Sequence, residues 1–267
     1  MQFSRRFVSV AAAAALALGL VACGGGSAPA AEGGSEETAK VYKIATDTTF
    51  APFEYADTDG TYVGIDVELL AAIAADQGFE YELEPLGFDA ALQAVQSGQS
   101  DGVIAGMSIT DARREVFDFS EPYYDSTVCA AAADASIKSL DDLKGKTVAV
   151  KTGTMSEAWA ESLKDQYGFT TVQFDTSDVM YQDVIAGNTA ACFEDTPVMS
   201  YAISTGNVAL TIVAEAASDS EYATPYGFAV NKGDNAELLA AFDAGLANIK
   251  ANGTYDKIVG TYVQSVG

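Results

Sequence analysis

The chain has 267 residues, no histidine, and 14 basic against 38 acidic residues, for a formal net charge of −24. The lack of histidine excludes Ser-His-Asp and Cys-His nucleophiles, histidine-ligated zinc and the usual general base. The acidity argues against a nucleic-acid partner, because binding phosphates requires clustered basic residues. With 49% apolar and 19% charged residues, the composition fits a globular protein of one large domain or two lobes.

Residues 1–22 have the pattern of a lipoprotein signal peptide. Two arginines precede an apolar run, and the run ends in the sequence LVAC at Cys23. A transmembrane anchor is the alternative, but the run is shorter than the roughly 20 residues that a membrane-spanning helix needs. We therefore expect lipidation of Cys23, a flexible tether over residues 23–40, and anchoring to the outer face of the cell membrane.

From residue 41 onward, the predicted strands and helices alternate. In the first part they are Val41–Thr46 (strand), Asp66 to Gly78 (helix), Phe79–Leu83 (strand), Ala90–Gln96 (helix) and Val103–Ala105 (strand). The spacing of apolar residues gives the first helix one buried face, made of Val67, Leu70, Ala71 and Ala74. Thr110 is the predicted N-cap of a further short helix.

The second part repeats this alternation. Its predicted elements are Asp141–Leu143 (helical turn), Thr147–Val150 (strand), Ser156–Tyr167 (helix), Thr171–Phe174 (strand), Ser177–Ala186 (helix), Ala190–Phe193 (strand) and Ala236–Lys250 (helix). The alternation implies parallel sheets with helices on their faces. Two extended stretches, Ser126–Ala132 and Gly227–Asn231, bracket the middle section. If both cross between two lobes, the first lobe is discontinuous.

One candidate binding segment lies around Arg113. Gly106 lets the backbone approach a ligand closely, and Ser108 supplies a hydroxyl and an N–H group. Arg113 lies in the first turn of a predicted helix, where a cation opposes the helix dipole unless an anion compensates it. A guanidinium group matches a carboxylate in bidentate geometry. The alternative is a surface arginine paired with Glu115 or Asp118.

Three further segments carry polar groups at the ends of predicted strands. Lys151 and Thr154 lie between a strand and a helix, where backbone N–H groups can bind an anion. Asp195 follows a buried strand, in a position that faces the ligand crevice of an open α/β sheet. Asp47 and Phe50 place an acceptor beside an aromatic ring. The alternatives are an ordinary turn for Lys151 and Thr154, a helix N-cap for Asp195, and a packed loop for Asp47 and Phe50. Together the four segments complement a free α-amino acid.

Seven segments then carry a family resemblance. They are ATDTTFAPFEY, YVGIDVELLAAIA, AGMSITDARREVFDFSEPYY, LKGKTVAVKTGT, EDTP, YGFAVNKGD and IKANGTYDKI. In this order and spacing they resemble the polar amino-acid solute-binding proteins of ABC importers (bacterial solute-binding protein family 3), from Val41 to the end of the chain. The Thr46-Asp47-Thr48, VAVK and DTP segments look most like the glutamine-binding branch.

The resemblance implies an α/β fold of two Rossmann-like lobes joined by a two-strand hinge, the periplasmic-binding-protein type II fold. Lobe 1 would combine residues 41–128 and 226–267, and lobe 2 would span residues 129–225. The implied function is to bind a free polar L-amino acid, glutamine first, and deliver it to an ABC permease. The chain would act as a monomer with no catalytic residue, cofactor or metal. An exported dehydratase on this fold and a sensor domain are the rival classes.

The resemblance also assigns the groups of the ligand that are common to all amino acids. Arg113 would hold the α-carboxylate, helped by the N–H groups of Ser108 and Thr154. Asp195 would pair with the α-ammonium group, with the carbonyl of Gly106 and the hydroxyl of Ser108 as further partners.

For the ligand side chain, the resemblance implies that Phe50 and Phe88 enclose the stem and that Asp47 and Lys151 reach its end. Asp47 would accept a hydrogen bond from a carboxamide, and Lys151 would donate one. One residue departs from the family pattern, because Glu194 stands where glutamine binders carry histidine. If Glu194 faces the ligand, a cationic amino acid such as arginine, lysine or ornithine is favoured; if it faces away, glutamine stands.

Overall fold

The computed structural model describes residues 40–263. The expected signal peptide, the lipidation site Cys23 and all of the expected tether except Lys40 lie outside the described residues. Within the described part of the chain, every helix is too short or too polar to cross a membrane.

A first five-stranded sheet has the order β5-β1-β6-β13-β7. Its strands are β5 (Glu80–Pro85), β1 (Val41–Thr46), β6 (Gly102–Val103), β13 (Ala229–Asn231) and β7 (Phe117–Phe119). β1 runs parallel to β5 and β6, whereas β13 is antiparallel to both of its neighbours. The fourth strand of this sheet, β13, is also the last of its five strands in the sequence.

A second five-stranded sheet has the order β10-β9-β11-β8-β12. Its strands are β10 (Thr170–Phe174), β9 (Thr147–Lys151), β11 (Cys192–Asp195), β8 (Val128–Ala132) and β12 (Thr211–Glu215). Here too the fourth strand, β8, is antiparallel to both neighbours, while β9 is parallel to β10 and β11. The two fourth strands, β8 and β13, lie within the two stretches predicted to cross between lobes.

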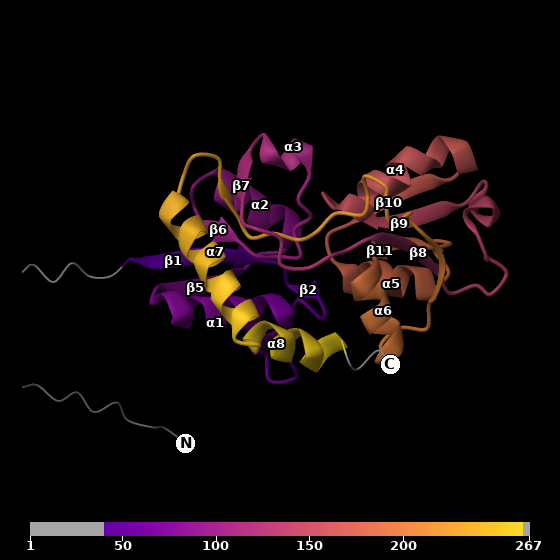
Figure 1. The fold of residues 1–267 in the computed structure, drawn as a ribbon. Coiled ribbons are helices and arrows are strands. Elements are labelled where there is room, and N and C mark those ends of the chain that lie inside the picture. The colour runs from indigo at the N-terminus through magenta and orange to yellow at the C-terminus, as the bar shows by residue number, and fades with distance from the viewer. Residues whose placement is uncertain (1–39, 264–267) are drawn as a thin grey trace, which may run out of the picture. The chain divides into compact units, whose positions relative to one another are not determined.

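Helices surround each sheet, as Figure 1 shows. They are α1 (Ile65–Gln77), α2 (Phe88–Gln96), α3 (Asp111–Arg114), α4 (Met155–Tyr167), α5 (Ser177–Ile185), α6 (Thr196–Ser204), α7 (Ala236–Ala251) and α8 (Thr254–Val263), with a 3₁₀ turn at Leu140–Leu143. A small sheet is formed by β2 (Thr49–Phe50), β3 (Glu54–Ala56) and β4 (Tyr62–Val63). We call the first sheet with its helices lobe 1 and the second sheet with its helices lobe 2. The predicted two-lobe α/β fold is confirmed, and the exact lobe boundaries stay predictions.

Helix α1 buries a wider face than the predicted one. Leu70 and Ala74 are buried as predicted and Ala71 is exposed, whereas Leu69 and Ile73 are buried in addition, because α1 packs against α7 and α8. The two helices approach closely at Gly245 of α7, where an added Cβ would lie 2.8 Å from Ile73. The predicted Ala236–Lys250 helix is present as α7, one residue longer, and Gly78 ends α1 in the left-handed conformation.

Strand β11 begins and ends two residues later than the predicted Ala190–Phe193 strand. It therefore includes Glu194 and Asp195 as its last two residues. Because successive side chains of a strand point to opposite faces of the sheet, these two carboxylates are directed apart. This shift decides which of them can reach the space between the lobes.

Candidate ligand-binding site

The predicted ligand residues of both lobes meet around a small cavity of about 10 Å³. Its lining is Phe50, Phe88, Ala105, Gly106, Ser108, Arg113, Lys151, Thr154, Met155 and Asp195. Eight of these were predicted. Ala105 and Met155 were not, because their apolar side chains suggest no ligand contact and only their position next to Gly106 and Thr154 could have indicated it. A cavity of this size holds about one water molecule, so an amino acid can enter only when the lobes separate.

Arg113 is held in a half-buried position by backbone groups of both lobes. Thr110 caps α3 as predicted, accepting a hydrogen bond from the N–H of Arg113 at 3.2 Å. The guanidinium group donates to the carbonyl oxygens of Ser108 (2.8 Å) and Gly153 (3.0 Å), and its Cζ lies 5.3 Å from the centre of the Phe88 ring. Burial lowers the pKa of Arg113 to about 10, so the group is still a cation at neutral pH.

The alternative of a surface ion pair for Arg113 is wrong. Within residues 40–263, Arg113 forms no ion pair, and Asp118 is instead 2.9 Å from Lys232. The charge at Arg113 is therefore oriented by carbonyl oxygens and is not neutralised by a carboxylate of the described residues. Such a group can bind an incoming carboxylate.

Gly106 fits its position only because it lacks a side chain. Its φ is +53°, and an added Cβ would lie 2.4 Å from the ring of Phe50. Its N–H donates to Asp66 Oδ2 at 2.8 Å. The loop that carries Gly106 and Ser108 is thus fixed against α1 on one side and against an aromatic ring on the other.

Asp195 is buried and held by a residue that sequence reasoning missed. The hydroxyl of Tyr226 donates to Asp195 Oδ2 at 2.5 Å and accepts from Ser126 Oγ at 2.9 Å. Tyr226 lies in the YGFAVNKGD segment, which returns the chain to lobe 1, and its tyrosine looks like an ordinary core residue. Burial, followed by the charge of Glu194, raises the pKa of Asp195. Asp195 is the N-cap residue of α6, but its side chain makes no capping bond.

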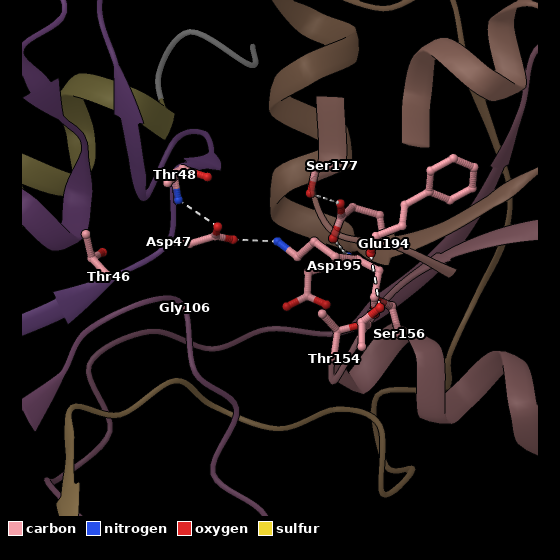
Figure 2. A network of polar contacts seen from close by, with 12 residues as sticks. Thr46, Asp47, Thr48, Gly106, Thr154, Ser156, Ser177, Glu194 and Asp195 are labelled. Atoms are coloured by element: carbon pink, nitrogen blue, oxygen red, sulfur yellow. Dashed lines mark hydrogen bonds and ion pairs between the residues drawn. The ribbon is translucent and has the colours of Figure 1, made fainter. Parts of the chain in front are cut away.

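Glu194 lies on the other face of β11, outside the lining of the cavity. Its Oε2 accepts from Ser177 Oγ and from the Tyr181 hydroxyl, each at 2.8 Å, and its Oε1 accepts from the N–H of Asp195 at 2.9 Å. Figure 2 shows the carboxylate of Glu194 beside Ser177, while Asp195 points towards the space between the lobes. Of the two alternatives for Glu194, the one in which it faces away from the ligand site agrees with this geometry.

A buried ion pair joins the two lobes. Lys151, at the end of β9, places its Nζ 2.6 Å from Oδ2 of Asp47, which follows β1. Oδ1 of Asp47 accepts the N–H of Thr48 at 2.6 Å, and the Lys151 Nζ lies 4.3 Å from the centre of the Phe50 ring. Burial alone would lower the pKa of Lys151, but Asp47 and Glu194 together raise it. Asp47 does not line the cavity itself; it reaches the site through Lys151.

Thr154 caps the start of α4. Its hydroxyl donates to the carbonyl of Lys151 at 2.7 Å and accepts from the N–H of Glu157 at 3.1 Å. The hydroxyl is therefore used within lobe 2, and a ligand would meet the positive N-terminal end of the helix.

Residues 42–265 match the family model of the bacterial extracellular solute-binding proteins, family 3. The arginine-binding extracellular protein ArtP of Bacillus subtilis is 30% identical over 256 residues, which cover 95% of this chain and 96% of that protein. Substrate-binding domain 2 of GlnP from Lactococcus lactis, solved in an open conformation, is 45% identical, with a TM-score of 0.58 over 83% of this chain and 94% of that one.

An ancestral arginine-binding protein, solved with arginine and with glutamine, is 37% and 36% identical. Its TM-scores are 0.75 and 0.74, and each comparison covers 83% of this chain and 97% of that one. These two ligand-bound structures match better than the more similar sequence in its open conformation, which agrees with the contact between the lobes at Lys151. By their names the relatives bind amino acids, outside the cell or in the periplasm, and serve in transport. The chain belongs to the bacterial extracellular solute-binding proteins, family 3.

Proposed function

We propose that this protein binds glutamine between its two lobes and delivers it to the permease of an ABC importer. The observation that supports this proposal is the Asp47–Lys151 pair: Lys151 lines the closed cavity as a donor, and Asp47 lies directly behind it as an acceptor that balances its charge. The carboxamide of glutamine requires both an acceptor and a donor. The α-carboxylate would bind the guanidinium of Arg113, and the α-ammonium group would bind Asp195.

The charge balance favours a neutral side chain over a charged one. A cationic side chain would meet the buried ammonium group of Lys151, and a glutamate side chain would meet the carboxylate of Asp47. Either like-charge contact costs several kcal/mol when it is not compensated. Glu194, which could have compensated a cation, has both oxygens occupied by donors of its own lobe.

Basic amino acids are the second candidate. Relatives are named as binders of arginine, or of lysine, arginine and ornithine, and one ancestral arginine binder has also been solved with glutamine. A family site can therefore accept ligands with either a neutral or a cationic side chain. Glutamate ranks third.

The mechanism is closure of the lobes without bond making. Ligand would first meet Arg113 in lobe 1, and closure about the two crossing segments would bring Lys151, Thr154 and Asp195 from lobe 2 and exclude water. Micromolar affinity corresponds to about −8 kcal/mol, which one bidentate ion pair, one ammonium site and two aromatic rings can supply. The closed form would then dock on the permease.

A thermal-shift scan tests the choice of ligand. Residues 24–267 would be unfolded and refolded to remove bound ligand, then heated with each of the twenty amino acids and with ornithine. A ligand at 100 times its Kd adds about 2.7 kcal/mol, or roughly 5–10 °C at this chain length. A response to glutamine alone supports the proposal, whereas a response to arginine or ornithine replaces glutamine by a basic amino acid.

Replacing Arg113→Ala tests the ligand site. The ligand carboxylate would lose its charged partner, and we expect a loss of at least about 2–3 kcal/mol, on the scale of hydrogen bonds to charged groups. Isothermal titration gives the affinity, and Arg114→Ala is the matched control, because the neighbouring arginine is exposed and does not line the cavity. An Arg113→Ala protein that binds within threefold of the wild type would rule out this assignment.

The lipid anchor is a separate part of the proposal. Cys23 after an apolar run matches a lipidation signal, and the lipid would hold the protein at the outer face of the membrane as a monomer. Labelling of the expressed protein with a radioactive fatty acid should be abolished by Cys23→Ser, which should also release the protein from the membrane fraction. Equal labelling of both proteins would contradict this anchor.

A further inference from the structure

Lobe 1 buries two carboxyl groups that the proposed binding mechanism does not use. Glu54, in β3, and Asp66, in the first turn of α1, are both completely buried. Asp66 Oδ2 accepts hydrogen bonds from the Gly106 N–H and the Tyr123 hydroxyl, each at 2.8 Å. Oδ1 of Asp66 and both oxygens of Glu54 have no hydrogen-bond donor among residues 40–263. Three acceptor atoms that lack a donor therefore belong to two neighbouring side chains.

The backbone holds these two side chains together. The N–H of Asp66 donates to the carbonyl of Phe53, the residue before Glu54, at 2.9 Å. The two chains approach so closely here that a Cβ on Gly64 would lie 2.2 Å from the carbonyl oxygen of Phe53. This backbone contact holds the bases of the two side chains together, and their carboxyl groups lie within hydrogen-bonding reach of each other.

Two adjacent buried carboxylates cannot both be ionised without a partner. The charged groups that act on Glu54 are Asp66, Asp47 and, from lobe 2, Lys151, whose ammonium group is already paired with Asp47. Within the part of the chain that the structure describes, no group of three or more acidic, cysteine or histidine side chains is placed to hold a metal ion. A proton on Glu54 turns one of its oxygens into a donor to Oδ1 of Asp66, so it pairs two of the three free atoms and leaves the third as the uncharged carbonyl oxygen of Glu54.

We infer that Glu54 keeps its proton at neutral pH and donates it to Asp66, and that this carboxyl pair positions the Gly106 loop of the ligand site. In this arrangement Asp66 is the ionised member, because it accepts from Gly106, Tyr123 and Glu54. The Gly106 loop leads directly to Ser108, whose carbonyl orients Arg113. The positioning role rests on the proposed ligand site, whereas the shared proton does not.

The electrostatic environment agrees with this assignment. Burial, followed by the charges of Asp66 and Asp47, raises the pKa of Glu54 well above its usual value, against a smaller opposite effect of Lys151. Burial raises the pKa of Asp66 to about 6, although hydrogen bonds from Gly106, Tyr123 and Glu54 lower it. The hydroxyl of Tyr123 stays protonated, since burial and the charge of Asp66 raise its pKa further.

The shared proton can be tested without any ligand. Glu54→Gln replaces the protonated carboxyl group by a neutral group of the same shape that can still donate. A raised folded-state pKa means that the wild type is stabilised below the unfolded pKa and loses this stability as pH rises towards the folded pKa. Glu54→Gln cannot titrate, so its unfolding equilibrium constant should fall relative to that of the wild type by up to tenfold per pH unit as the pH rises from about 5 towards the folded-state pKa of Glu54.

Infrared spectroscopy provides a direct reading of the same proton. The difference spectrum of wild type minus Glu54→Gln at pH 7 should contain the C=O stretch of a protonated carboxyl group. Unfolding curves that stay parallel between pH 5 and 8, together with a spectrum that shows only an ionised carboxylate, would overturn the assignment of the proton. Urea unfolding of the full chain gives the pH series.

The positioning role is tested with glutamine as the probe. Glu54→Gln should bind glutamine within threefold of the wild type, whereas Asp66→Asn should bind at least tenfold more weakly, because the amide cannot accept all three hydrogen bonds. Asp76→Asn, an exposed position at the other end of α1, is the matched control. Asp66→Asn binding like the wild type, or Glu54→Gln binding tenfold more weakly while folded, would overturn the positioning role. If the wild type itself does not bind glutamine, the proposed function fails and the unfolding series still decides the proton.

Discussion

Glu54 in lobe 1 and Glu194 in lobe 2 are both completely buried, but their hydrogen-bonding environments are opposite. Glu194 accepts from two hydroxyl groups and one backbone N–H, whereas no donor of the described residues reaches either oxygen of Glu54. A carboxylate with three donors can remain ionised inside a protein, while one beside another carboxylate must hold a proton. Each lobe therefore buries an acid near the ligand site, but lobe 2 supplies hydrogen-bond donors to its carboxylate, whereas lobe 1 places a second carboxyl group beside it.

The difference also assigns different tasks to the two glutamates. Glu194 is tied to α5 through Ser177 and Tyr181, so it links the second sheet to a helix on the side of β11 that faces away from the cavity. Glu54 acts through Asp66 and so affects the backbone of the loop that approaches the ligand. Of the two, Glu194 is the one whose charge, after that of Asp47, raises the pKa of Lys151 against the effect of burial.

The largest effect should come from Glu194→Leu. This change leaves the hydroxyls of Ser177 and Tyr181 and the N–H of Asp195 without their acceptor, and each buried donor left alone costs about 1–3 kcal/mol. We expect the free energy of unfolding in urea to fall by about 3 kcal/mol or more. Glu54→Gln at pH 8 is the contrast, because it should not be destabilised at all. If Glu194→Leu unfolds at the same urea concentration as the wild type, the two glutamates do not differ as described.

Tyr181→Phe should have an intermediate effect. It removes one of the three donors to Glu194 and leaves the ring in place, so the expected loss is about 1.5–3 kcal/mol, the range for a hydrogen bond to a charged group. Thermal or urea unfolding measures it, and Tyr167→Phe on α4, whose hydroxyl forms no side-chain hydrogen bond within residues 40–263, is the control. A loss equal to that of the control would mean that Glu194 does not need its hydroxyl donors.

The smallest effect concerns Asp195, the neighbour of Glu194. The raised pKa of Asp195 means that glutamine affinity should fall as pH is lowered through that pKa, because only the ionised carboxylate attracts the ligand ammonium group. Tyr226→Phe removes a hydrogen bond that lowers this pKa, so the fall should begin at a higher pH and reach up to tenfold per unit below it. Titration calorimetry between pH 5 and 8 checks it, and identical pH profiles of the two proteins would exclude a role for the Tyr226 hydroxyl.

Periodicity predicted most of the fold, because apolar residues at helical or strand spacing bury one face regardless of their partner. It was right only in part for α1, where Leu70 and Ala74 are buried as predicted but Leu69 and Ile73 are buried as well, since α7, which lies far along the chain, covers them. It also ended β11 two residues early, since a charged pair reads as the end of a buried strand. The side of the sheet on which the Glu194 side chain lies depends on where β11 ends. The sequence therefore left open whether Glu194 faces the ligand or faces away from it.

The candidate site shows the same division. Arg113, Asp195 and Phe50 were predictable because they stand in segments that resemble a known family. Asp66 and Tyr226 were not assigned to the site. An aspartate in the first turn of a helix usually stabilises the helix end from the solvent side, and a tyrosine in an apolar segment usually packs in the core. Only the three-dimensional contacts with Gly106 and Asp195 reveal what these two side chains do.

The place of the crossing strands has a consequence for how the chain is made. All five strands of the second sheet lie within residues 128–215, but the first sheet needs β13, and the Phe228 N–H reaches its acceptor Ser120 across 108 residues of sequence. Pairing between distant segments forms late in folding, because a long loop must be closed first. Synthesis therefore starts lobe 1 first and completes it last. The first sheet can be complete only after β13 has been synthesised, because β13 lies between β6 and β7.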